Sequence, residues 1–174
     1  MTIAHSQVRS GTYQIDTARS QVAFVASHLW GVGQVHGSFR VREGTVHVAE
    51  GPETTRIDAV VDLTTFKTDK AKRDSDVLSK RFLDAANYPD LRFTGVAATG
   101  ASGGGVGTVD GLLDRHGHIA PATISVVGIE VTDEGLVATA TARVDRTKLG
   151  VSGGRPIVNR WLDLTLRIVL TRSL

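Results

Sequence analysis

The stretch Leu162-Asp163-Leu164-Thr165-Leu166-Arg167-Ile168-Val169-Leu170 decides the fold class of this chain. Apolar side chains occupy every second position, and polar side chains stand between most of them. Successive residues of a β-strand point to opposite faces, so the pattern predicts a strand with one apolar face and one wet face. Such strands are typical of antiparallel sheets, which meet water on one side.

The same alternation recurs earlier in the chain. It places on shared faces Val22, Phe24, Ala26 and His28, then Val35, Gly37, Phe39 and Val41, then Ile57, Ala59, Val61 and Leu63. Turn signals separate the apolar runs, at Glu43-Gly44, Gly103-Gly104-Gly105, His116-Gly117 and Asp133-Glu134-Gly135. Long strands that contain Gly favour a closed barrel, because closure requires tilt and coiling. We therefore predict an all-β antiparallel barrel.

One segment, at about residues 70–86, interrupts the strand pattern. Its apolar residues have roughly helical spacing, Asp74 or Ser75 can cap a helix, and Pro89 forbids continuation. The sequence therefore predicts one short helical insert between two strands. The insert is basic, with Lys67, Lys70, Lys72, Arg73, Lys80 and Arg81 against Asp69, Asp74 and Asp76.

Length and composition limit the classes of protein. A chain of 174 residues fits one domain, which we expect at residues 11–174 behind a flexible segment at 1–10. The absence of cysteine excludes disulfides, zinc-thiolate sites and a Cys nucleophile. A net charge of +2 does not predict nucleic-acid binding. Without a secretory h-region or an apolar run of membrane-spanning length, we expect a cytoplasmic protein without stable membrane insertion.

Several short motifs, taken in order, resemble the YceI-like family. They are Tyr13-Gln14-Ile15-Asp16, Gly37-x-Phe39, Thr68 with Arg73-Asp74, Phe82-x-Asp84, Tyr88-Pro89-x-Leu91-x-Phe93, Gly111-x-Leu113 with Gly117, and Asp145-Arg146 with Leu149-Gly150-Val151. The resemblance implies an eight-stranded lipocalin-like barrel with an elongated apolar tunnel, and the family includes polyisoprenoid-binding proteins. It also implies pairwise assembly, hence a possible homodimer. The chain departs from the family pattern at Asp76, where many members carry His, and at Leu83, where Phe is common.

From the inward stripes and the resemblance together we predict a set of ligand-binding residues. They are Val22, Phe24, His28, Phe39, Val41, Leu63, Arg73, Asp74, Phe82, Phe93, Leu113, Leu164, Leu166 and Ile168. A plainer interpretation makes the apolar members a filled core and Arg73-Asp74 a structural ion pair or helix cap. His28 is either a contact to the head of a ligand or a core histidine bonded to a backbone carbonyl.

The function predicted from these features is binding, with sequestration or transport of a long apolar ligand such as a polyisoprenoid or an isoprenoid quinone. We expect no cofactor and no metal, since the remaining His residues lack carboxylates at ligand spacing. No Gly-x-Ser-x-Gly elbow is present, and Gly103-Gly104-Gly105 lacks the Gly-Lys-Ser/Thr end of a phosphate loop. The alternatives are an enzyme that uses His28 on a lipophilic small molecule, and a ligand-free interaction or stress-related module.

Overall fold

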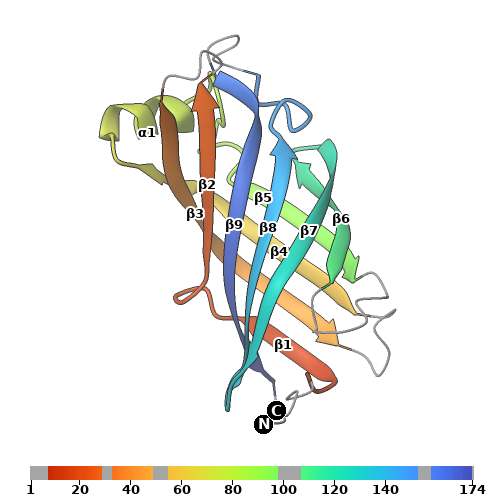
Figure 1. Cartoon of the computed structure of the whole chain (residues 1–174). Coiled ribbons are helices and arrows are strands. Elements are labelled where there is room, and N and C mark those ends of the chain that lie inside the picture. Colours follow the sequence, from red (N-terminus) through yellow and green to blue (C-terminus); the bar gives the residue numbers. More distant parts are fainter. Residues whose placement is uncertain (1–7, 29–32, 49–54, 98–106, 153–157, 174) are drawn as a thin grey trace.

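The computed structural model describes residues 8–28, 33–48, 55–97, 107–152 and 158–173, without the side chains of His28 and Val158. Strands dominate these ranges, and one short helix interrupts them (Figure 1). The elements in chain order are β1 Gly11–Ile15, β2 Gln21–His28, β3 Gln34–Val48, β4 Arg56–Thr68, α1 Ala71–Leu78, β5 Asp90–Ala97, β6 Thr108–Arg115, β7 His118–Val131, β8 Gly135–Asp145 and β9 Val158–Arg172.

The strands form one antiparallel sheet that closes on itself. From β2 the order runs through β9, β8, β7, β6, β5 and β4, and β4 pairs with β3, which returns to β2. Short β1 pairs with the same two neighbours as β2, namely β3 and β9, so β1 and β2 share one place in the ring. This confirms the predicted eight-stranded antiparallel barrel.

The break between β1 and β2 is built by local side-chain hydrogen bonds. Oδ1 of Asp16 accepts from the backbone N–H groups of Ala18 and Arg19, at 3.0 and 3.1 Å. Ser20 is buried, and its Oγ accepts from the N–H of Val169 at 2.9 Å. These side-chain bonds take the place of strand-to-strand backbone bonds. The chain therefore leaves the sheet after β1 and rejoins it at β2.

The turn predicted at Glu43-Gly44 is wrong, because β3 continues through it as a single strand. The pairing with β4 shifts register between Val41 and Glu43, as in a β-bulge. A Cβ on Gly44 would lie 2.3 Å from Cδ1 of Ile15. Gly44 therefore serves close packing inside a long bent strand, which in sequence looks the same as a turn signal.

Two other predicted turns are present in the structure. His116 and Gly117 both have positive φ, 50° and 82°, and join β6 to β7 as a two-residue hairpin of the primed type. The segment Asp133–Gly135 carries the chain from β7 into β8. The predicted tip at Gly103-Gly104-Gly105 lies outside the described residues.

The insert contains one helix, as predicted, but α1 covers only Ala71–Leu78. The chain then runs in turns to Pro89, with the buried Leu83 and Ala85 bonded back to the carbonyls of Val77 and Leu78 at 2.9 and 3.1 Å. The predicted caps are wrong, since Lys70 is the N-cap and Asp74 lies inside the helix. Over the described ranges, no helix is long and apolar enough to cross a membrane.

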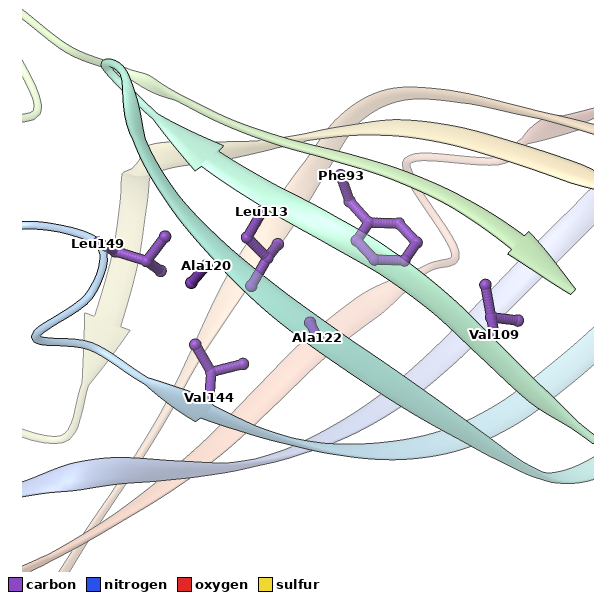
Figure 2. Packing of buried hydrophobic residues seen from close by; sticks show 7 residues of the cluster. All are labelled: Phe93, Val109, Leu113, Ala120, Ala122, Val144 and Leu149. Carbon is purple, nitrogen blue, oxygen red and sulfur yellow. The ribbon is translucent and has the colours of Figure 1, made fainter. Parts of the chain in front are cut away.

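Apolar side chains from the strands meet inside the barrel (Figure 2). The cluster drawn there joins β5, β6, β7, β8 and the turn after β8, through Phe93, Val109, Leu113, Ala120, Ala122, Val144 and Leu149. Its members Phe93 and Leu113 are directly paired across β5 and β6, and Leu113 pairs in turn with Ala120 of β7. The apolar face predicted for these strands is therefore the inner face of the barrel wall.

Candidate ligand cavity

The barrel encloses a cavity of about 780 Å³. Every strand contributes apolar side chains to its wall, from Ile15 on β1 to Leu170 on β9. This volume lies within the range of about 300–1,000 Å³ that is typical of small-molecule and cofactor sites. A cavity of this size favours a ligand site over the plainer interpretation of the inward stripes as a filled core.

Small residues on β8 keep the interior open. The three central inward positions of this strand are Ala138, Ala140 and Ala142, and all three line the cavity. They pair respectively with the larger Ile168, Leu166 and Leu164 of β9. An eight-stranded barrel is just wide enough to be filled by large side chains, so a run of alanines leaves space for a slender ligand.

An aromatic cluster forms part of the wall, from Phe24, Phe39 and Phe66. The ring centroids lie 5.4–5.5 Å apart, and the rings of Phe24 and Phe66 are stacked. Phe66 escaped the sequence prediction because β4 carries extra residues between Asp62 and Lys67, opposite Arg40 and Ser38 of β3. These extra residues break the period of two. Phe66 therefore faces the interior, as Leu63 does, although the two are three positions apart.

The two ends of the barrel differ. At the end that carries β1, opposite α1 in Figure 1, a compact cluster closes the interior around Tyr13, Val46, Leu136 and Leu170. All four side chains are buried, and the hydroxyl of Tyr13 donates to the carbonyl of Arg9 at 2.7 Å. This end is therefore sealed by packing over the described residues.

At the other end the cavity wall becomes polar. Around α1 it includes Lys70, Lys72, Arg73, Asp76 and Arg81, and most of these side chains are exposed. A cavity whose wall contains both buried apolar and exposed charged residues reaches the surface there. The opening therefore lies beside α1, and its rim is mainly cationic.

The Arg73-Asp74 pair acts through Thr68 rather than as an ion pair. Oδ1 of Asp74 accepts from the N–H and the hydroxyl of Thr68, at 2.9 and 2.6 Å. Nη1 of Arg73 reaches Asp69 at 3.1 Å and the hydroxyl of Thr68 at 3.5 Å. Both side chains therefore tie α1 to the end of β4, but neither as the predicted ion pair with each other nor as a helix cap. Arg73 also lines the cavity.

Most of the predicted ligand-binding residues line this one cavity. They are Val22, Phe24, Phe39, Val41, Leu63, Arg73, Phe82, Phe93, Leu113, Leu164, Leu166 and Ile168. Asp74 turns instead toward Thr68. His28 ends β2, but its side chain lies outside the described part of the chain. That any of these residues contacts a ligand stays a prediction.

Sequence reasoning missed two buried cations in the wall, Arg115 and Arg146, each 6% exposed. Arg146 donates from Nε to the carbonyl of Asn159 at 3.0 Å and from Nη1 to that of Val151 at 2.9 Å. The alternating pattern could have identified Arg115, because it shares the inward face of β6 with Val109 and Leu113. Within the described ranges, no three His, Cys, Asp or Glu side chains gather as a metal site.

An antiparallel barrel around an apolar cavity open at one end is the architecture of ligand-binding barrels such as the lipocalins. Within this class the particular family is clear, because residues 13–170 match the model of the YceI-like domain. The chain belongs to the YceI-like family.

Similar curated proteins include a UPF0312 protein of Pseudomonas fluorescens (strain SBW25), 34% identical over 125 residues, which is 70% of this chain and 64% of the relative. A UPF0312 protein of Vibrio campbellii is 32% identical over 115 residues, covering 64% of this chain and 60% of the relative. The match thus spans less than two thirds of the length of these relatives.

Solved structures share the fold. Burkholderia cenocepacia BcnA superposes with a TM-score of 0.72 at 20% identity, over 88% of this chain and 98% of BcnA. A polyisoprenoid binding domain from Saccharophagus degradans, implicated in plant cell wall breakdown, superposes with a TM-score of 0.67 at 14% identity, over 92% of this chain and 98% of that domain. At these identities the likeness establishes the barrel and leaves the ligand to be argued from the cavity.

Proposed function

We propose that this protein binds a long apolar ligand, such as a polyisoprenoid or an isoprenoid quinone, inside the barrel and sequesters or carries it through water. The observation that carries the proposal is the cavity of about 780 Å³ with apolar walls from every strand. Each methylene that such a ligand buries contributes roughly 0.8 kcal/mol. A chain of many methylenes is therefore held firmly without any catalytic group.

The two ends of the cavity orient the ligand. The tail lies along the faces of Phe24, Phe39, Leu164 and Leu166, which are apolar throughout. The polar head lies at the α1 end, because the charged part of the wall is there. Entry and exit take place beside α1, since the opposite end is packed closed by buried side chains.

The choice of ligand class has independent support. A domain with the same fold, from Saccharophagus degradans, is described as a polyisoprenoid binding domain. A prenyl chain is slender, flexible and apolar, and these properties suit a narrow barrel interior lined by alanine, valine, leucine and phenylalanine.

The cytoplasmic location and the homodimer predicted from the sequence are separate expectations of this proposal. Cell fractionation checks the first. Light scattering on the purified protein, across a range of concentrations, checks the second. Neither result changes what the cavity itself is proposed to hold.

The direct test is to purify the protein natively, extract it with organic solvent and analyse the extract by mass spectrometry. A single prenyl lipid, quinone or similar long-chain lipid at near-stoichiometric amount is the expected result. An extract without lipid, from folded protein that also fails to take up geranylgeraniol when it is added, would overturn the proposal.

A further inference from the structure

Arg115 is a buried cation in the apolar wall of the cavity. It ends β6, follows Val109 and Leu113 on the inward face, and is 6% exposed. The turns around Leu83 and Leu149 lie next to it, so it stands at the α1 end of the barrel, deeper than the exposed rim. Long charged side chains rarely occupy such a position unless a partner accompanies them.

The protein satisfies this guanidinium only in part. Nη1 donates to the carbonyl of Leu149 at 2.9 Å, and Nη2 donates to the carbonyl of Leu83. Nε is closed to solvent and has no acceptor among the described residues. The ion pairs of the described part of the chain likewise leave Arg115 out. Two neutral carbonyls therefore hold a full positive charge.

The electrostatic surroundings also disfavour the charge on Arg115. Burial lowers the pKa of the Arg115 guanidinium, and the nearby Asp84 and Tyr88 oppose the shift only in part. An arginine nevertheless stays protonated in a protein. A buried charge that forms no ion pair is unfavourable. A negatively charged group that entered the cavity beside Arg115 would supply such a partner.

We propose that Arg115 binds the head of the ligand, so that the cavity takes an apolar chain ending in an anionic group, a carboxylate or a phosphate. The inference rests on the function proposed above and narrows its ligand class. A guanidinium has five N–H donors, and Leu83 and Leu149 occupy one on each terminal nitrogen. The second N–H of each terminal nitrogen remains for a charge-assisted bond to the anion.

The first experiment compares ligands of one chain length on the wild-type protein. Hexadecanoate, hexadecyl phosphate and methyl hexadecanoate compete for the cavity against a neutral fluorescent dye. We expect an anionic ligand to bind about 10- to 100-fold more tightly than the ester, as a hydrogen bond to a charged group implies. Comparison of hexadecanoate with hexadecyl phosphate then distinguishes the two anions. Equal affinity of all three would overturn the inference.

A matched pair of variants locates the effect. Arg115→Gln removes the buried charge but keeps a donor for one carbonyl, and we expect it to bind acid and ester alike. Lys80→Gln removes an exposed cation of the same insert that does not line the cavity, and we expect it to keep the preference for the acid. Equal loss of the preference in both variants would make it a general effect of the insert's positive charge and overturn the assignment to Arg115.

The outcomes separate this inference from the proposed function. If wild-type protein binds acid and ester equally well, the cavity is a lipid site and Arg115 merely ties the Leu83 and Leu149 turns together. If it binds none of these ligands, nor geranylgeraniol, the proposed function itself fails. Should Arg115→Gln not fold, the comparison on wild-type protein still decides, because it needs no variant.

Discussion

In the wall of the cavity, Gly37 lies against Phe24, its pairing partner across β2 and β3. A methyl group on Gly37 would lie 2.3 Å from Cζ of Phe24 and 2.6 Å from the carbonyl oxygen of Lys67. Phe24 is buried and stacked on Phe66, so it cannot move aside freely. We expect Gly37→Ala to lower the free energy of unfolding by about 1–3 kcal/mol, measured by urea denaturation.

Gly128 offers the matched control for this substitution. It also lies within a strand, β7, but a Cβ there would meet nothing within 4 Å. Gly128→Ala should change the free energy of unfolding by no more than about 0.5 kcal/mol. Similar losses in both variants would show that the cost is a general one of replacing strand glycines and has nothing to do with Phe24.

Asp145 gives the barrel a dependence on acid. Its buried carboxylate accepts from the N–H and the hydroxyl of Thr147 at 3.0 and 2.6 Å, and Arg160 lies 3.7 Å away. Burial raises the pKa of this carboxyl, but the bonds from Thr147 and the charges of Arg160 and Lys148 outweigh it. The pKa in the folded protein therefore lies below that of an ordinary Asp.

The sign of the effect follows from linkage. The unfolded chain takes up a proton near its ordinary pKa of about 4, before the folded protein does. The stabilisation is fully present above that pH and is lost as the pH falls toward the folded pKa. We expect the urea midpoint to drop below about pH 4, and to drop less steeply in Asp145→Asn. An unchanged slope in this variant would show that Asp145 is not one of the groups responsible.

The strands show where reasoning from sequence succeeds. On β2, β6 and β9 the period of two identifies the cavity-facing side chains, because the backbone of a regular strand alone decides which face a residue takes. Phe24, Leu113 and Leu166 all lie where the alternation places them. Phe66 on β4 was missed because a bulge changes the phase of the alternation and leaves no mark in the composition.

Other features depend on tertiary contacts that composition does not reveal. Gly44 looked like a turn because nothing in the chain indicates that Ile15 packs against it. The helix ends at Leu78 because the following turns bury Leu83 and Ala85 against the barrel, which local spacing does not encode. That Asp74 bonds to Thr68 instead of capping is likewise a property of the folded insert.

Within β8, enlarging one of the cavity-lining alanines tests whether the ligand binds inside the barrel. Ala140 is 4% exposed and pairs with Leu166. Ala140→Leu should fill space that the ligand would use, displacing about three methylenes at roughly 0.8 kcal/mol each, so affinity for geranylgeraniol should fall by about 2 kcal/mol. The same change should raise the free energy of unfolding of the ligand-free protein by about 0.5–2 kcal/mol. Dye displacement and urea denaturation measure the two effects.

Thr139, the outward neighbour of Ala140, is exposed and provides the control. Thr139→Leu adds a similar side chain to the outer face, where it has no access to the cavity. It should leave the affinity for geranylgeraniol unchanged. A loss of affinity in Thr139→Leu as large as that in Ala140→Leu would mean that the binding site is not the barrel interior.

In the whole molecule, the closed ring of strands links the free energy of unfolding to ligand binding. Every strand contributes to the cavity wall, and each described strand is paired on both sides, so the sheet has no open edge over these residues. A ligand in the cavity therefore contacts the whole barrel, and it binds the folded chain alone. Occupancy should consequently stabilise all the strands together rather than a single region.

The ligand-free protein should accordingly be measurably less stable than the loaded protein. Geranylgeraniol at about 100 times its dissociation constant should add about 2.7 kcal/mol to the free energy of unfolding, or about 5–10 °C in Tm. Leu166 lines the middle of the β9 stripe, so Leu166→Gln should abolish both binding and this shift. Arg167→Gln, on the exposed outer face of the same strand, should keep them. Differential scanning calorimetry decides, and a full shift in Leu166→Gln would place the ligand elsewhere than along β9.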